Sequence, residues 1–352
     1  MSLLDTTCAA IVDIDDEAAR GAQRLLDGKT KPRGSLGRLE DLACKIAAIT
    51  RCPRPAVPSP AIVVMAGDHG VAQEGVSAYP PEVSRQMLLN FARGGAAINV
   101  LARQAGARLV VVDMGVRGPA EEIPGVLSRR IRPGTDNFVH GPAMTVADAV
   151  LALERGIDVA RELTESGVGL VGLGEMGIGN TTVATALLAA FSGAPARVIT
   201  GHGTGIDDAT RIRKIAIIEK ALSVNRVAGR SAVEVLAALG GFEIAGLAGV
   251  VLGAASRRVP VVLDGFIAST AALCAAKMAP KAAQYVIASH RSAEVGHQSV
   301  LQALGCEPLL DMGLRLGEGT GAALAMPLIE AAVRILHEMA SFDEAHVTDT
   351  GR

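Results

Sequence analysis

Two glutamates in glycine-rich segments are the residues of this sequence best suited to chemistry. Glu175 lies in "GLGEMGIGN" and Glu318 lies in "LRLGEGTGAALA". Glycine-rich loops that lead into helices usually bind anions through backbone N–H groups. A carboxylate has the wrong charge for such a site, so we expect the pair to do acid–base work, with apolar surroundings raising one pKa. The alternative is that each glutamate accepts backbone N–H bonds and caps the following helix.

The segment around Glu175 also predicts a phosphate site. Gly177 and Gly179 allow a ligand to approach the backbone, and Asn180 with the two threonines after it offers capping oxygens to the next helix. A second turn, "GHGTGID", follows the next apolar run, and Lys214 lies on the helix beyond it. We therefore expect one phosphate between the two turns. For either turn alone, a tight connection without a ligand is the alternative.

The same segment contains a dinucleotide-binding fingerprint, because Gly172, Gly174 and Gly177 match G-x-G-x-x-G. That fold needs an acidic residue about twenty positions later, at the end of the next strand. Here the run "ARVIT" ends in Thr200, and Glu175 would face the pyrophosphate. An NAD(P)-dependent oxidoreductase is therefore the less favoured alternative, beside a non-catalytic module that binds a phosphosugar.

The elements that must position these residues are predicted by apolar runs, each rich in β-branched residues and followed by a helical pattern. Runs of this kind are typical of strands buried on both faces, and their alternation with helices predicts a Rossmann-like parallel sheet flanked by helices. Ligands of such sheets bind at the carboxyl ends of the strands, where His69 and His202 also lie in glycine turns. The runs are 61–70, 107–116, 167–177, 196–205, 259–266 and 284–292.

The two ends of the chain are predicted to be helical. Residues 16–27 and 36–50 show helical spacing, and the proline-rich residues 51–61 then form a connector that no helix or central strand could contain. A last helix is entered after Gly321.

Composition excludes several classes of protein. The chain has 352 residues with 34 basic and 36 acidic side chains, so no basic face for nucleic acid is indicated. No signal peptide and no uninterrupted apolar run of membrane-spanning length is found, and the scattered five cysteines fit free thiols in the cytoplasm. The clustered aspartates that magnesium prefers are missing, so we expect neither a metal nor a cofactor.

Six segments together resemble the nicotinate-nucleotide:dimethylbenzimidazole phosphoribosyltransferase (CobT) family, in order and spacing from about residue 30 to residue 335. The resemblance implies transfer of phosphoribose from nicotinate mononucleotide to dimethylbenzimidazole, giving α-ribazole phosphate and nicotinate with inversion at the anomeric carbon, for the lower ligand of cobalamin. The segments are "KPRGSLGRLEDLA", "AGDHGVAQEGVSAYPPEV", "GLGEMGIGNTT", "GHGTGID", "LDGF" and "LRLGEGTGAALAMPLIEAA".

The resemblance also assigns roles. Glu318 matches the family's catalytic base, which takes the benzimidazole N–H proton, and Glu175 matches a second active-site glutamate. The phosphate is expected on Gly177, Ile178, Gly179, Asn180, Gly203, Thr204, Gly205 and Lys214. Contacts to the base or ribose are expected from Ser77, Tyr79, Gln86, Asp264 and Leu316, and orientation of a glutamate is the alternative role for Asp264.

The family's architecture implies a small helical domain made from both chain ends and a homodimer. For this sequence the division would be residues 1–59 and 320–352 in the small domain and residues 60–319 in the large catalytic domain.

Overall fold

One parallel sheet forms the centre of the molecule, which a computed structural model describes for residues 1–118, 122–203 and 205–349. The strand order is β3-β2-β1-β4-β5-β6, so the chain enters at the middle, runs outward to β3, and returns to β4 on the other side. This is the doubly wound order, and it leaves a crevice between the carboxyl ends of β1 and β4. The strands are β1 Pro60–Gly67, β2 Arg108–Gly115, β3 Val126–Ser128, β4 Leu170–Met176, β5 Val261–Leu263 and β6 Val286–Ala288.

The predicted α/β class with a parallel sheet is confirmed, but one predicted strand is wrong. Residues 196–200 form the short helix α8 (Ala196–Ile199) after Pro195, and the Thr200 N–H bonds to the carbonyl of Ala196 at 3.0 Å. The strand preference of these β-branched residues is not realised, because β5 and not this segment pairs with the free edge of β4. The sequence also gave no signal for β3, an edge strand of three residues.

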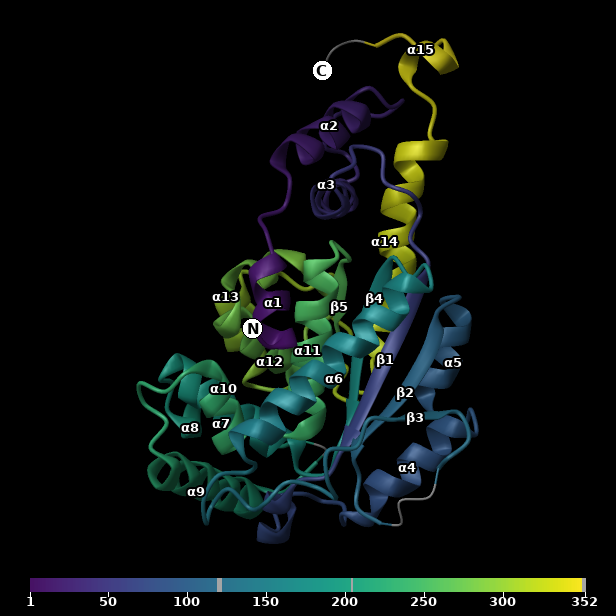
Figure 1. Cartoon of the computed structure of the whole chain (residues 1–352). Helices are drawn as coiled ribbons and strands as arrows, with labels where there is room; N and C mark the ends of the chain where they lie inside the picture. Colours follow the sequence, from purple (N-terminus) through teal and green to yellow (C-terminus); the bar gives the residue numbers. More distant parts are fainter. Residues whose placement is uncertain (119–121, 204, 350–352) are drawn as a thin grey trace.

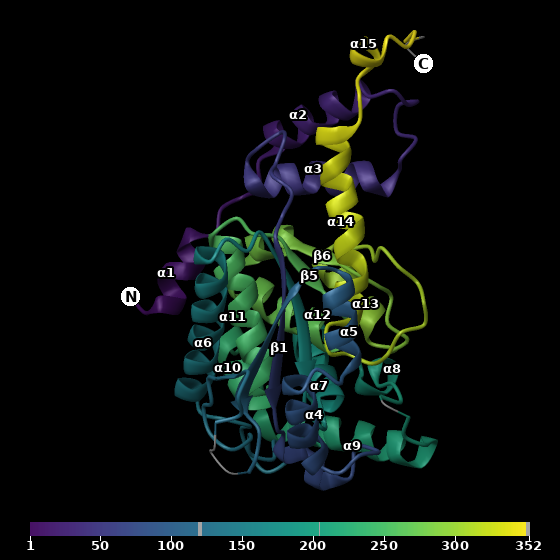
Figure 2. The same cartoon turned by 90° about the vertical axis from the view of Figure 1, so that its right-hand side faces the viewer.

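The two faces of the sheet pack into two apolar cores. Along β1, Val63 and Met65 belong to one core and Ile62 and Val64 to the other, as the alternation of side chains in a strand requires. Figure 2 shows the helices that cover each face. One face carries α6 (Val146–Glu165), α11 (Phe242–Ser256) and α12 (Phe266–Met278), and the other carries α4 (Glu82–Ala92), α5 (Ala97–Gln104) and α14 (Thr320–Glu338).

The contact between α6 and α11 depends on glycine. A Cβ on Gly156 would overlap the carbonyl oxygen of Gly246, and a Cβ on Gly249 would overlap the carbonyl oxygen of Leu153. The two backbones therefore approach more closely than any side chain would allow. Helix α11 of this close layer lies against β1, β2 and β4, and β1 and β4 border the crevice.

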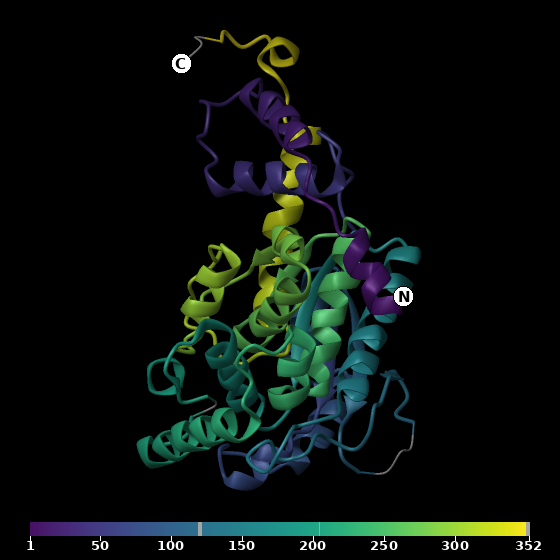
Figure 3. The same cartoon turned by 60° about the vertical axis from the view of Figure 1, so that its left-hand side comes forward.

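Both ends of the chain contribute to a smaller helical part beyond the sheet. Helices α2 (Asp16–Asp27) and α3 (Arg38–Thr50), which match the two predicted helices, pack beside α14 (Figure 1). By contrast α1 (Leu3–Ala10) lies against α6 and α11, at the large part (Figure 3). The exact domain limits stay a prediction.

Helix α14 joins the two parts. Within the described residues it alone has the length and hydropathy of a membrane span, with 19 residues and a mean hydropathy of 1.2, but 56% of that window is buried inside the protein. Packing against α3, β4 and β5 explains its apolar composition. The remaining elements are η1 Gly70–Glu74, α7 Asn180–Ser192, α9 Asp208–Asn225, α10 Ala232–Leu239, η2 Pro280–Tyr285, α13 His297–Leu304 and α15 Phe342–Ala345.

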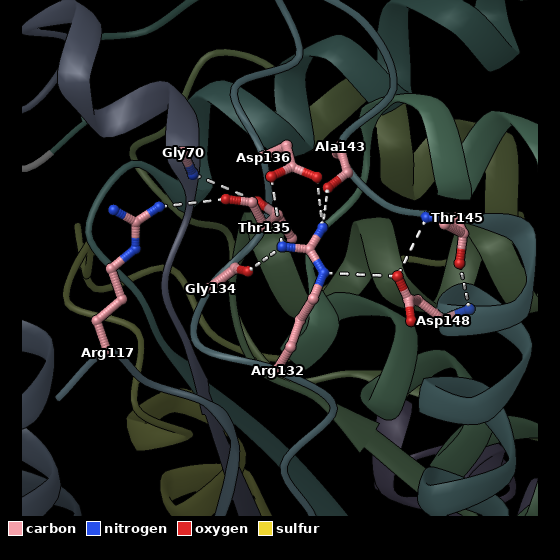
Figure 4. Close-up of polar contacts among 9 residues, drawn as sticks. All are labelled: Gly70, Arg117, Arg132, Gly134, Thr135, Asp136, Ala143, Thr145 and Asp148. Carbon is pink, nitrogen blue, oxygen red and sulfur yellow. Dashed lines mark hydrogen bonds and ion pairs between the residues drawn. The ribbon is translucent and has the colours of Figure 1, made fainter. Parts of the chain in front are cut away.

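An arginine network fixes the long connection between β3 and α6 at the carboxyl edge of the sheet (Figure 4). Arg132 donates to the carbonyls of Gly134 at 2.8 Å and Ala143 at 3.0 Å, and to the Asp136 carboxylate at 2.7 Å. The Thr135 N–H donates to the carbonyl of Asp68, just past β1, at 2.9 Å. The connection is thereby held against the end of β1.

The α6–α11 contact predicts a clear stability effect for Gly156→Ala. Alanine favours a helix over glycine, yet overlap with the Gly246 carbonyl should lower the free energy of unfolding by at least about 2 kcal/mol in a urea titration. Gly28→Ala is the matched control, because its φ is −84° and the nearest atoms lie 3.7 Å from the added Cβ. Equal stability of the two variants would contradict this account.

Candidate active site

A pocket opens at the carboxyl edge of the sheet, beside the end of β4. It holds about 610 Å³ of space outside the protein atoms, open in part to solvent. Its walls come from the end of β4 and the start of α7, the turn after α8, the start of α12, and the segments that follow β6 and precede α14. Side chains on these walls include Glu175, Thr181, His290, Ser292, Glu294 and Arg315.

The two glutamate segments are packed directly on one another. A Cβ on Gly174 would overlap the carbonyl of Glu318, and a Cβ on Gly317 would overlap Oε1 of Glu175. Glycine at both positions is therefore what allows the two loops to touch. The structure thus brings together Glu175 and Glu318, which are far apart in the sequence.

Asp264 holds the segment that carries Glu318. Its Oδ2 accepts the N–H of Gly319 at 3.0 Å and its Oδ1 accepts the N–H of Gly321 at 2.7 Å. It therefore satisfies donors at the start of α14, where a helix leaves N–H groups unpaired. Its oxygens already serve these bonds, so of two conceivable roles, binding the ribose or orienting a glutamate, the contacts favour orientation.

Glu318 does not cap the helix that follows it. The N-cap of α14 is Gly319, without a side-chain cap bond, and Glu318 itself has a left-handed φ of 64°. Its side chain is 6% exposed, and Oε2 has no hydrogen-bond partner among the described residues. An unpaired buried carboxylate oxygen costs stability, which is typical of a functional group.

Burial shifts the pKa of both glutamates upward. For Glu318, burial and the nearby charge of Asp264 raise the pKa, against a backbone hydrogen bond from Ile98. For Glu175, burial and the carboxylates of Asp264, Glu243 and Glu318 raise the pKa well above its ordinary value, and the Asn180 amide only partly opposes this. Of the two glutamates, Glu175 therefore has the stronger upward shift of its pKa, which favours its neutral form.

Two buried histidines contact this carboxylate cluster. The His290 Nε2 lies 3.5 Å from Asp264 Oδ1, and although burial lowers the pKa of His290, that carboxylate raises it above the ordinary value. The His69 Nε2 lies 2.8 Å from Glu243 Oε1, with both side chains fully buried. Glu243 and its pairing with His69 gave no sequence signal, because Glu243 lies in an ordinary helical stretch.

The predicted phosphate turns lie together around Lys214. The buried Lys214 Nζ donates to Thr181 Oγ1 at 2.7 Å, and a Cβ on Gly203 would lie 3.7 Å from that Nζ. Burial lowers the pKa of Lys214 to about 8, with Glu294 opposing the shift. Below that pH the site holds a cation between the two glycine turns.

Other predicted donors differ from expectation. The Ile178 N–H already donates to Ser84 Oγ at 3.1 Å. The expected side-chain cap of α7 is wrong, because its N-cap is Gly179 with φ 95° and no side-chain bond, while Asn180 donates to Glu175 instead. Thr204 lies outside the described residues, and Gly205 is exposed.

The residues expected near the base divide into two groups. Leu316, 55% exposed, lines the pocket next to Arg315. Ser77, Tyr79 and Gln86 do not line it: Ser77 Oγ accepts the Tyr79 N–H at 3.2 Å, and Tyr79 is 52% exposed. Their assignment stays a prediction. Sequence reasoning missed Arg315, although a cation beside a glycine segment was a usable signal.

Comparisons with known proteins agree with one another. A family model described as phosphoribosyltransferase matches residues 11–347. The nicotinate-nucleotide–dimethylbenzimidazole phosphoribosyltransferase of Chloroflexus aggregans is 55% identical, and that of Geobacter sulfurreducens is 52% identical, each over 99% of both chains. The crystal structure of CobT from Thermus thermophilus superposes with a TM-score of 0.91 at 48% identity, covering 94% of this chain and 99% of that one.

The raised pKa of Glu175 predicts the stability of Glu175→Gln. The folded chain holds the Glu175 proton above the pH at which the unfolded chain loses it, so this group's contribution to stability falls as pH rises from about 4.5. Glutamine mimics the neutral acid and removes that loss. We expect the melting temperature of the variant to exceed that of the parent by about a few degrees at pH 8, with the difference vanishing near pH 4.

Glu338→Gln on the surface of α14, where the side chain is 61% exposed, is the control and should show no such pH-dependent gain. A Glu175→Gln variant that melts lower than the parent at pH 8 would show that Glu175 is ionised in the folded chain.

Proposed function

The chain belongs to the nicotinate-nucleotide–dimethylbenzimidazole phosphoribosyltransferase family, and from that premise we propose which of its residues perform the reaction. The enzyme transfers the phosphoribosyl group of nicotinate mononucleotide to dimethylbenzimidazole, which yields α-ribazole phosphate and nicotinate and supplies the lower ligand of cobalamin. An oxidoreductase and a non-catalytic binding module are not favoured.

The transfer reaction requires a base but no general acid. The glycosidic nitrogen of the donor is a cationic pyridinium, so its bond to the anomeric carbon can break with the electron pair returning to nicotinate. One ring nitrogen of dimethylbenzimidazole attacks that carbon from the opposite side, which inverts the configuration from β to α. The other ring nitrogen must then lose its proton, because otherwise the product carries a positive charge.

Glu318 is the base in this proposal, and its free oxygen is the observation that carries it. Its Oε2 has no protein partner within the described residues, in a segment that borders the pocket and is fixed by Asp264. Burial and the Asp264 charge raise the pKa of Glu318, which makes its carboxylate a stronger proton acceptor. The same carboxylate offsets the positive charge that develops on the attacking ring.

Glu175 complements the base because its raised pKa favours the neutral form. Its high pKa leaves a carboxyl group that can donate a hydrogen bond, and the neighbouring Gly317 places it beside the Glu318 segment. We assign it to the sugar and base side of the pocket, where it polarises a substrate oxygen or nitrogen without adding a second anion to the site.

The phosphate of the donor is assigned to the other side of the pocket. Lys214, Gly203 and the start of α7 surround that position, and a helix N-terminus favours a negative group there. Because the Ile178 N–H is taken by Ser84, the Asn180 N–H by the Gly177 carbonyl and the Asn180 side-chain amide by Glu175, we assign the phosphate to the amides of Gly177 and Gly179.

Two further properties belong to the proposal. We place the enzyme in the cytoplasm, since all five cysteines are free thiols, as a reducing compartment would keep them. We also propose a homodimer, on the resemblance to the family.

The base assignment predicts the behaviour of Glu318→Gln. With nicotinate mononucleotide and dimethylbenzimidazole as substrates, and nicotinate release followed by chromatography, kcat should fall at least about 100-fold, the usual share of a general base. In the parent, kcat should fall as pH drops through the raised pKa of Glu318, so the acid limb lies above pH 4.5. The residual activity of the variant should lack this limb.

Glu330→Gln, a substitution of the same kind on the surface of α14, should retain full kcat. Undiminished turnover in Glu318→Gln would refute the base assignment. A variant that fails to fold would instead favour a structural role, which circular dichroism separates from a loss of chemistry.

Light scattering coupled to gel filtration tests the proposed oligomeric state. The chain has a mass of 36.0 kDa, so a dimer gives twice that value at micromolar concentration. A mass of one chain over the whole elution peak would contradict the homodimer.

A further inference from the structure

Glu294 is an acidic residue in the part of the pocket that the phosphate is proposed to use. It lies in the segment between β6 and α13, is only partly exposed, and lines the same pocket as Thr181, Gly203 and Arg315. Its backbone N–H donates to Ser292 Oγ at 3.3 Å, which fixes the turn from which the side chain extends. No step of the transfer reaction described above uses it.

The Glu294 carboxylate occupies the glycine turn itself. A Cβ on Gly201 would overlap its Oε2, and the Gly203 N–H donates to the carboxylate. Gly203 in turn lies beside Thr181 Oγ1 and the Lys214 Nζ, at 3.2 and 3.7 Å from its ideal Cβ position. The side chain thus takes a hydrogen bond from one of the N–H groups assigned to the phosphate.

The charges around Glu294 are those that a phosphate would need. Lys214 on α9, Arg315 before α14 and His202 after α8 all lower the pKa of Glu294, although burial has the larger effect and raises it overall. The carboxylate therefore offsets the charge of the buried Lys214 and of the exposed Arg315 at the pocket. Nothing else in the described pocket supplies an anion on this side, because the other carboxylates gather around Asp264.

We propose that Glu294 is an internal competitor for the phosphate subsite, which a phosphate monoester must displace from Gly203 and the surrounding cations in order to bind. The inference rests on the proposed function, since it takes the phosphate position from it. The physical consequence is a lower affinity for every phosphate monoester, both substrate and product, because binding exchanges one set of anion contacts for another.

Competition between Glu294 and the phosphate speeds product release. Nicotinate mononucleotide and α-ribazole phosphate carry the same phosphate, so any contact that holds both equally lowers KM without raising kcat and delays product release. An acid that returns to the cations as the product leaves reduces that delay. Glu294 therefore sets the affinity for phosphate while Glu318 sets the chemistry.

Inorganic phosphate is the probe that tests this inference on the full ligand-free chain, by calorimetric titration at pH 7.5. Glu294→Gln keeps the size of the side chain but removes its charge, and Glu294→Ala removes both. We expect each to bind phosphate about tenfold more tightly than the parent, and to show a lower KM for nicotinate mononucleotide and stronger inhibition by α-ribazole phosphate. Glu219→Gln, which removes a charge from the exposed face of α9, should bind phosphate as the parent does.

Lys214→Met separates the two proposals. If it weakens phosphate binding while the Glu294 variants bind phosphate no more tightly than the parent, the subsite stands and the competition is refuted. If Lys214→Met leaves phosphate binding unchanged, the subsite assignment itself fails, and the inference fails with it. Should Lys214→Met not fold, Thr181→Val, which removes the hydroxyl that Lys214 contacts, takes its place with the same two outcomes.

Discussion

The rest of the site depends on the hydrogen bonds that the Asp264 carboxylate accepts from the start of α14. It follows β5, a strand next to β4, and its oxygens bind the N–H groups of Gly319 and Gly321 at the start of α14. A helix from the end of the chain is thereby anchored at the carboxyl edge of a sheet whose strands begin near residue 60. This anchor helps to fix the left-handed backbone of Glu318, together with the packing of its segment on Gly174.

The cost of that anchor is a concentration of negative charge. Asp264, Glu175, Glu243 and Glu318 interact through a largely buried volume, where like charges repel strongly. The structure reduces the cost because the raised pKa of Glu175 favours its uncharged form and because His290 lies against Asp264. Repulsion from Asp264 also raises the proton affinity of Glu318, which suits the role of base proposed for it. The buried carboxylates that cost stability thus include the glutamate proposed as the base.

The opposite side of the pocket has the reverse polarity. Lys214, Arg315 and the N-terminus of α7 make it receptive to an anion, and Glu294 balances these charges in the ligand-free chain. Under the proposed assignment, the acidic side faces the ring that gains positive charge, the basic side binds the phosphate, and the phosphoribosyl group lies between them.

The sequence by itself determined the class of the sheet, five of its strands, the two glutamates and the glycine turns, because each leaves a local pattern: an apolar run, a charge where none is expected, a residue that permits φ above zero. It failed where the outcome depends on distant partners. Residues 196–200 look like a strand and form a helix, since β5 occupies the edge they would need. The Ile178 amide looks free and is held by Ser84, and Asp264 serves a helix that begins more than fifty residues later. Only the tertiary structure decided which of the two glutamates has the more strongly raised pKa, because burial and the repulsion among carboxylates from separate segments set that shift, and no local sequence pattern records either quantity.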